Sequence, residues 1–130
     1  MSLRCLIVDD HAPFVAAARK ILEGDELTVL GAAATAAEAL EQADHLAPNV
    51  ILIDIDLGSD SGLDVARDLA GRADGVFPLI VLISGYPEDD FADLIEEGPA
   101  LGFVAKSELS ADAIIDLVRR RGAAQPGRSA

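Results

Sequence analysis

The hydrophobic pattern of this chain alternates between two kinds of segment. Short runs of aliphatic and β-branched residues, typical of strands, are followed by longer stretches with apolar residues three or four positions apart, typical of helices. Strands are predicted at residues 3–8, 27–33, 50–53, 78–84 and 101–104. Helices are predicted at residues 12–23, 62–70 and 89–97, and two more begin after Thr35 and Ser110 and end near Leu46 and Arg121.

Several of these helices carry recognisable end signals. Thr35 and Glu38 have the spacing of a capping box, and Ser110 is placed to cap the last helix. In the first helix, Gly24 marks the end. The face of that helix expected to pack on the core carries Phe14, Ala17, Ala18 and Ile21.

Two of the predicted strands, at 50–53 and 78–84, are apolar on both faces, which is typical of central strands in a parallel sheet. Five strand–helix units in succession indicate an α/β fold with a parallel sheet and helices on both of its faces. The length of 130 residues suits one domain. We expect that domain to span residues 3–121, and residues 122–130, rich in Gly, Ala and Pro, to form a disordered tail or a linker.

Composition narrows the classes of function. The formal net charge of −13 disfavours binding to nucleic acids and to anionic membranes, but it suits a metal cation. The single cysteine, Cys5, cannot form an intrachain disulfide, and its place in an apolar run indicates a buried structural thiol. The longest apolar run, at 76–83, is too short to cross a bilayer, and the N-terminus lacks the pattern of a signal peptide. A cytoplasmic location is therefore expected.

Polar residues follow four of the predicted strands. Asp9 and Asp10 end the first strand, Asp54 ends the third, Ser84 ends the fourth, and Lys106 follows the fifth. Because ligands of open α/β sheets bind outside the carboxyl ends of the strands, these side chains should share one edge. Carboxylates select a hard cation such as Mg²⁺, and phosphoryl transfer needs charge neutralisation and positioning rather than further covalent help. A carboxylate can itself be the nucleophile, which would give an acyl phosphate.

Each of these residues also has a simpler explanation when taken alone. An acidic pair after a strand often caps a helix, a task open to Asp10 or His11, and a lone aspartate after a buried strand is commonly a turn residue. For the whole set, the simple explanation requires five coincidences on one edge, so a phosphoryl-transfer site is the better interpretation. His11 is interpreted as a residue that caps a helix or lines a loop, and His45 as a residue late in a solvated helix.

Four segments, LIVDDH, LIDIDLGSDSGLDVA, PLIVLIS and GFVAK, resemble the receiver domain of bacterial two-component response regulators. The spacings match as well, because Asp54 lies 44 positions after Asp10, Ser84 lies 30 after Asp54, and Lys106 lies 22 after Ser84. The resemblance covers about residues 3–121. It implies a flavodoxin-like, doubly wound sheet of five parallel strands in the order 2-1-3-4-5, and a function in phosphorelay signal transduction.

The resemblance also implies roles for individual residues. Asp54 matches the phosphoacceptor. Asp9 and Asp10 match the acidic pair that holds Mg²⁺, with Asp10 as the direct ligand, and Asp56 matches the position whose backbone carbonyl ligates the metal. Ser84 matches the hydroxyl residue that bonds the phosphoryl group.

Three more positions match the family pattern. Lys106 corresponds to the cationic partner of the phosphoryl group, and Phe103 to the aromatic switch residue that works with Ser84. Gly62 corresponds to the glycine that opens the third helix.

Partners follow from the same resemblance. The phosphoryl donor would be a sensor histidine kinase or a phosphotransfer protein, and phosphorylation could produce a homodimer. The segments DDH and GLDVAR resemble the subfamily that often carries a C-terminal helix-turn-helix, which this chain is too short to contain. We expect no direct contact with nucleic acid or membrane, and no enzymatic activity beyond self-catalysed phosphoryl acceptance and hydrolysis.

The sequence departs from the family pattern in three places. Ser107 follows the lysine where the family usually has proline, the turn at 58–61 lacks the common proline, and Pro99 replaces the usual glycine before the last strand. These departures concern loop conformation and the output face. The side chain of Asp56 is also placed where it could meet an incoming water and so affect the lifetime of the phosphoryl group.

Three other functions fit parts of the sequence. Asp54-Ile55-Asp56 resembles the nucleophile motif of haloacid-dehalogenase-type phosphatases, but that motif belongs on the first strand and leaves the acidic pair unexplained. A receiver-like interaction module that does not use phosphate would have no need for the intact acidic residues, Ser84 and Lys106. A flavodoxin would have a Ser/Thr-rich phosphate loop after the first strand, where this chain is acidic.

Overall fold

The computed structural model describes residues 3–58, 60–71, 78–85 and 102–123. Its main sheet has five parallel strands in the order β2-β1-β3-β6-β7. These strands are β1 (Leu3–Val8), β2 (Leu27–Ala33), β3 (Val50–Asp54), β6 (Leu79–Ser84) and β7 (Gly102–Ala105). In chain order of the main-sheet strands this is 2-1-3-4-5, so the expected topology is confirmed.

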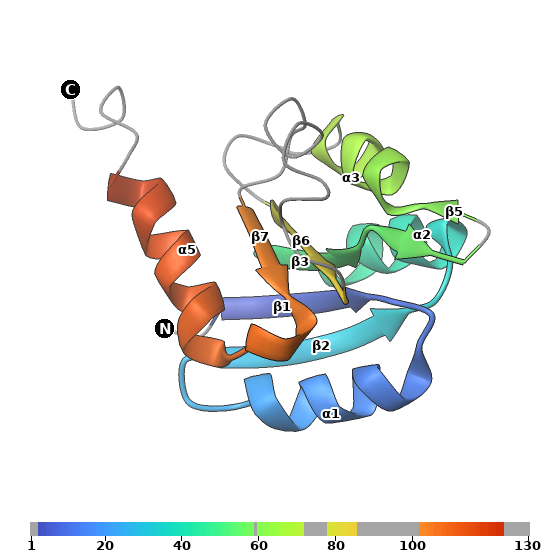
Figure 1. The fold of residues 1–130 in the computed structure, drawn as a ribbon. Coiled ribbons are helices and arrows are strands. Elements are labelled where there is room, and N and C mark those ends of the chain that lie inside the picture. Colours follow the sequence, from blue (N-terminus) through green and yellow to red (C-terminus); the bar gives the residue numbers. More distant parts are fainter. Residues whose placement is uncertain (1–2, 59, 72–77, 86–101, 124–130) are drawn as a thin grey trace.

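Helices cover both faces of this sheet, as Figure 1 shows. The helices are α1 (Ala12–Leu22), α2 (Ala36–Leu46), α3 (Gly62–Gly71) and α5 (Ala111–Ala123), with a short 3-10 turn η2 (Lys106–Glu108) before α5. Helices α1 and α5 lie on one face, and α2 and α3 lie on the other. The helix expected at 89–97 falls outside the described residues.

Two apolar layers, one on each face of the sheet, form the core. Strands β1, β3 and β6 contribute alternate residues to both layers, which explains why their sequences are apolar throughout. The layer under α1 and α5 includes Cys5, Ile7, Leu52, Ile83, Leu22 and Ile114. The layer under α2 and α3 includes Leu6, Val8, Ile51, Ile53, Val65 and Leu69. Among the described residues, no helix is long and apolar enough to span a bilayer.

The face that α1 presents to the core differs from the expected one. Ala18 and Leu22 are buried and Phe14 is partly buried, but Ala17 is exposed and Ile21 is half exposed. The buried positions lie four residues apart, so the helix is rotated by about one residue from the predicted orientation. The prediction for Ala17 and Ile21 was therefore wrong, because apolar spacing fixes a stripe only to within one neighbouring position.

The predicted caps of α2 and α5 are confirmed. The hydroxyl of Thr35 accepts a hydrogen bond from Glu38 N–H at 3.2 Å, and that of Ser110 accepts one from Ala113 N–H at 3.0 Å. The Glu38 carboxylate accepts a hydrogen bond from Ala34 N–H at 2.8 Å, one residue before the cap. The last helix extends to Ala123, two residues beyond the expected end.

The C-terminus of α2 ends in a strained residue. Ala47 has a φ of 47°, in the left-handed region that disfavours any residue with a Cβ. The Arg4 guanidinium donates hydrogen bonds to the carbonyls of Leu46 and Ala47, which holds this helix end against β1. The sequence shows no glycine here, so the left-handed turn was not predictable.

Replacing Ala47 with glycine is therefore expected to stabilise the fold by about 1 kcal/mol, because glycine adopts this backbone without strain. Equilibrium unfolding in urea measures the change. The matched control is Ala37→Gly at an exposed position inside the same helix, which should cost up to about 1 kcal/mol. Destabilisation by both substitutions would contradict the assignment of strain to Ala47.

The thiol of Cys5 is expected to be inert in the folded protein. Cys5 is fully buried in β1, and burial raises its pKa to about 12. Because the thiolate is the reactive form, a soluble thiol reagent should not modify the native chain at neutral pH. The same reagent should react completely in denaturant. Rapid modification of the native protein, followed by its absorbance or mass, would contradict the placement of Cys5.

Candidate functional site

Three carboxylates meet at the carboxyl edge of the sheet. Asp9 and Asp10 follow β1, Asp54 ends β3, and one carboxylate oxygen from each lies within 4.8 Å of those of the other two. Asp9 and Asp54 are almost completely buried, whereas Asp10 is exposed. The prediction that these residues share one edge is confirmed. They meet there because the neighbouring parallel strands β1 and β3 end side by side.

The ammonium group of Lys106 lies among these carboxylates. Its Nζ atom is 2.7 Å from Asp9 Oδ2 and 3.2 Å from Asp54 Oδ2. Lys106 is the first residue after β7 and begins the turn η2. One ammonium among three carboxylates leaves an excess of negative charge, which is suited to a cation.

Backbone N–H groups fix the two buried carboxylates. Asp54 Oδ1 accepts a hydrogen bond from Asp56 N–H at 3.0 Å, and Asp9 Oδ1 accepts one from His11 N–H at 2.8 Å. In each carboxylate, the second oxygen is the one that faces Lys106. His11 occupies the N-cap position of α1 but makes no capping bond through its side chain. Of the two roles expected for His11, a cap or a loop residue, the structure therefore supports the loop residue.

Burial changes the acid–base properties of this cluster. Burial raises the pKa of Asp54 above its usual range, the neighbouring Asp9 charge adds to this effect, and the contacts with Asp56 N–H and Lys106 offset it only in part. For Lys106, burial alone would lower the pKa. The contacts with Asp9 and Asp54 outweigh that effect, so the pKa of Lys106 lies above its usual value and the ammonium stays charged at neutral pH.

Two glycines allow the loop after β3 to approach the acidic residues. This loop contains a small hairpin, β4 (Asp56–Leu57) and β5 (Asp60–Ser61), which the sequence pattern did not predict. At Gly58, where φ is +61°, a Cβ would lie 2.7 Å from Asp10 Oδ2. At Gly62, a Cβ would lie 1.9 Å from the carbonyl oxygen of Asp54, so this position admits glycine only.

The remaining predicted residues lie nearby. Ser84 ends β6, the strand next to β3, and is 1% exposed. Phe103 lies in β7, is partly buried, and packs against the apolar layer under α2 and α3. The Asp56 side chain is exposed, while its backbone N–H contacts Asp54.

The donor set fits a hard divalent cation. Asp9 Oδ2 is buried, and its contact with Lys106 has the distance of an ion pair without the angles of a hydrogen bond. Carboxylate oxygens at this spacing are ligands that suit Mg²⁺. Of the residues that the structure describes, Asp9, Asp10 and Asp54 are the group with metal-ligand geometry.

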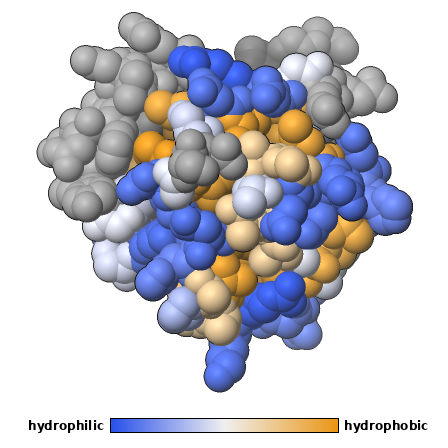
Figure 2. Space-filling view, turned by 90° about the vertical axis from the view of Figure 1, so that its right-hand side faces the viewer, coloured by the Kyte–Doolittle hydropathy of each residue, from blue (hydrophilic) through white to orange (hydrophobic). Residues whose placement is uncertain are grey.

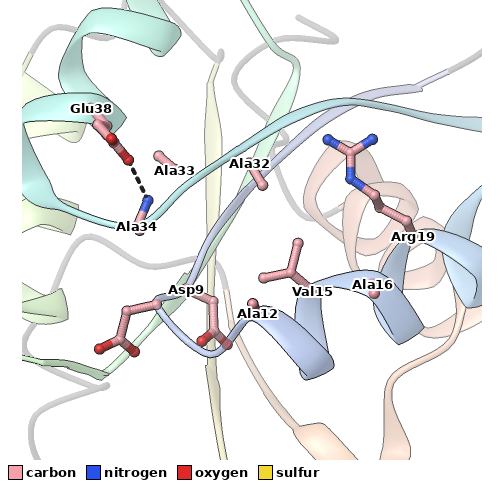
Figure 3. Close-up of a pocket in the computed structure, with 10 residues that line it drawn as sticks. Asp9, Ala12, Val15, Ala16, Arg19, Ala32, Ala33, Ala34 and Glu38 are labelled. Carbon is pink, nitrogen blue, oxygen red and sulfur yellow. Dashed lines mark hydrogen bonds between the residues drawn. The ribbon is translucent and has the colours of Figure 1, made fainter.

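A hollow of about 350 Å³ opens beside this cluster, between α1 and the end of β2. In Figure 3, Asp9 and Ala12 lie at one end and Arg19 and Ala32 at the other, and the Glu38 carboxylate accepts the hydrogen bond from Ala34 N–H at one side of the hollow. Its lining is mostly small and apolar. Figure 2 looks at the side of the molecule toward which β1 and β2 run, and shows apolar residues exposed between hydrophilic ones. The sequence pattern does not indicate this hollow, because the hollow forms between elements rather than within one.

One neighbour of the cluster was missed as a site residue. The Lys106 Nζ atom lies 4.3 Å from the centroid of the Phe14 ring. The pattern placed Phe14 in the core, and it does pack partly on the layer under α1 and α5. Phe14 and Lys106 are 92 positions apart in the sequence, and no local sequence pattern predicts a contact between them.

A parallel sheet in this order, with an acidic cluster and a lysine at its carboxyl edge, defines a receiver domain of two-component signalling. The family comparison agrees with the geometry. The chain belongs to the response regulator receiver domain family, whose model matches residues 5–119. Membership of this family rules out the phosphatase and flavodoxin interpretations of the sequence.

Individual relatives support the same assignment. The chain is 29% identical over 118 residues to the transcriptional regulatory protein DegU of Brevibacillus brevis, covering 90% of this chain and 49% of DegU. It is 26% identical over 106 residues to the DNA-binding transcriptional activator EvgA of Escherichia coli, covering 82% of this chain and 51% of EvgA. The chain thus spans about half the length of these curated relatives.

A solved structure gives a matching fold. The response regulator domain of Thermotoga maritima CheB superimposes with a TM-score of 0.76 at 26% identity, covering 92% of this chain and 96% of that one. The similarity of fold therefore extends over nearly the whole of both chains.

Proposed function

We propose that this receiver domain accepts a phosphoryl group on Asp54. The observation that carries the proposal is the environment of that carboxylate. It is buried beside Asp9 and Asp10, one oxygen is fixed by Asp56 N–H, and the other faces the Lys106 ammonium. The carboxylate is thus held in place before a donor arrives, which is what phosphoryl transfer requires of a protein.

The chemical step is a displacement at phosphorus. A carboxylate oxygen of Asp54 forms a bond to the phosphorus of the donor, the bond to the leaving group breaks, and its electron pair stays with the leaving group. With a phosphohistidine donor, on a sensor histidine kinase or a phosphotransfer protein, the leaving group is the imidazole nitrogen. Lys106 and Ser84 hold the phosphoryl oxygens. The product is an acyl phosphate on Asp54.

Magnesium fits the same site. Asp9, Asp10 and Asp54, with the backbone carbonyl of Asp56, would hold it, and Asp10 is the exposed member open to a hydrated ion. When bound, Mg²⁺ neutralises charge that develops on the phosphoryl oxygens. The Lys106 ammonium, 3.2 Å from Asp54 Oδ2, would contribute to the same neutralisation.

The test is phosphorylation by a small donor. Incubation with acetyl phosphate and Mg²⁺, followed by measurement of the intact mass, should show one added phosphoryl group. A chain that stays unmodified while its fold is intact would indicate the alternative, a receiver-like interaction module that does not use phosphate.

The proposal extends to partners and output. The protein works in the cytoplasm with a kinase or phosphotransfer partner, and its activity is limited to its own phosphorylation and dephosphorylation. Phosphorylation could favour a homodimer. EvgA is a DNA-binding activator, but this chain, with a net charge of −13, is not expected to contact nucleic acid itself.

The switch would involve Ser84 and Phe103. When Ser84 moves toward the phosphoryl oxygen, it vacates space that the ring of Phe103 can enter from the adjacent strand β7. Both side chains should therefore change position in a complex with beryllofluoride, which stands in for the phosphoryl group. The measurement is a pair of crystal structures, free and bound. Unmoved Ser84 and Phe103 side chains in the bound form would contradict this switch.

A further inference from the structure

Among the described residues, the Lys106 ammonium has an aromatic neighbour in addition to the two carboxylates. It lies 2.7 Å from Asp9 Oδ2, 3.2 Å from Asp54 Oδ2, and 4.3 Å from the centroid of the Phe14 ring. The ring comes from the first turn of α1, which follows directly after the acidic pair. It is anchored because Phe14 also packs against the apolar layer under α1 and α5.

This arrangement has a physical consequence for the lysine. A cation over an aromatic face is attracted by the ring quadrupole, and the attraction grows as water is excluded. The Lys106 side chain is 19% exposed, so most of its surroundings are protein. A lysine has a flexible four-carbon stem and a strongly hydrated ammonium group. Without the ring, the ammonium would gain freedom to turn toward solvent and away from Asp54.

We propose that Phe14 is a positioning residue for phosphoryl acceptance, whose ring holds the Lys106 ammonium against the Asp54 carboxylate. The inference rests on the proposed function of Asp54. When a phosphoryl group arrives, the ion pair with Asp9 has to loosen if Lys106 is to contact a phosphoryl oxygen. The ring contact need not break, because attraction to a ring face tolerates small shifts of the cation. Phe14 thus keeps the ammonium at the reacting centre throughout.

A direct test of the contact uses the small number of lysines. The chain has two, Lys106 and the exposed Lys20 on α1. In protein labelled with ¹³C-lysine, the ε-protons of Lys106 should be shifted upfield by the Phe14 ring, whereas those of Lys20 should resonate at the ordinary position. The shift should disappear in Phe14→Leu and persist in Phe14→Tyr. Coincident, ordinary shifts for both lysines in the native protein would overturn the inference.

The functional test follows the rate of labelling by acetyl phosphate with Mg²⁺. Phe14→Leu keeps an apolar side chain but loses the ring, and labelling should slow by about three- to tenfold. Phe14→Tyr keeps the ring and should recover most of the native rate. Phe14→Met, a flexible apolar residue, serves as the second ring-free variant if the leucine variant folds poorly. A ring-free variant that folds and labels at the native rate would overturn the inference.

A double substitution tests whether Phe14 acts through Lys106. In the background of Lys106→Met, the change from Phe14 to Leu should have no further effect on labelling, because there is no ammonium left to position. An undiminished effect in that background would show an independent role and overturn the inference. If native protein takes up no phosphate although the Lys106 shift is present, the phosphoacceptor function itself fails, and the ring contact stands as a structural feature.

Discussion

Replacing Asp54 with asparagine is expected to abolish phosphoryl incorporation and to raise the melting temperature of the same protein. The first effect follows because the amide lacks the nucleophilic carboxylate oxygen. The second effect, the higher melting temperature, follows because burial raises the pKa of Asp54. The charged form of Asp54 is therefore less favourable in the folded chain than in the unfolded chain. A single exchange should therefore remove the function and stabilise the fold.

The sign of the pH dependence can be worked out. Between the usual pKa of an aspartate, about 3.9, and the raised pKa of Asp54, the folded chain binds more protons than the unfolded chain. The contribution of this residue to stability therefore falls as the pH rises through that window. Asparagine does not titrate, so the gain in melting temperature should be larger at pH 7 than at pH 4.

The measurements are intact mass after acetyl phosphate treatment and thermal melts without Mg²⁺ at the two pH values. The matched control is Asp25→Asn, the same exchange on an exposed side chain in the loop before β2, away from the acidic cluster. That control should still be labelled. Labelling of the Asp54→Asn protein at another residue would refute the assignment of the acceptor, and a lower melting temperature at pH 7 would show that the lost Lys106 contact dominates.

Magnesium is expected to stabilise the native protein strongly, and Asp10→Asn is expected to weaken that response while raising the metal-free melting temperature. Two like charges about 4 Å apart repel by roughly 4 kcal/mol at an effective dielectric constant of about 20. Asp10 is exposed, so water reduces this value, and Lys106 already offsets charge on Asp9 and Asp54. Relief of about 1 kcal/mol would raise the melting temperature by a few degrees.

The effect of the ion follows from mass action. A ligand of the folded state at about 100 times its dissociation constant adds about 2.7 kcal/mol of stability. Thermal melts with and without millimolar Mg²⁺ measure this for both proteins. The matched control is Asp25→Asn, an exposed aspartate in the loop before β2, at the opposite edge of the sheet. Its Mg²⁺ response should equal that of the native chain.

Two results would contradict the shared site. If the native protein ignores Mg²⁺, the three carboxylates do not form a cation site. If Asp10→Asn also melts lower than the native protein without metal, the acidic pair serves as a helix cap, and its charge stabilises rather than strains the fold.

Much of the fold was determined by the sequence alone. The strands are short apolar runs with sharp ends, so the local pattern was enough to place them. Strands β3 and β6 are apolar on both faces, and this pattern identified them as central strands of the sheet. The polar residues Asp9, Asp54 and Ser84 come directly after such runs. Parallel strands bring their carboxyl ends together, so their convergence was predictable without any knowledge of side-chain contacts.

Other features were decided only by the tertiary structure. Side-chain contacts between distant elements depend on how each helix is rotated about its axis on the sheet. Apolar spacing fixes that rotation only to within one residue position. Ile21, expected to face the core but 50% exposed, is an example. The contact of Lys106 with Phe14, the raised pKa of Asp54 and the left-handed Ala47 all arise from such packing. Sequence periodicity indicates which residues become buried when the chain folds. Which side chains these buried residues contact depends on the tertiary structure. There, burial and charge act over a few ångströms between residues that are far apart in the chain.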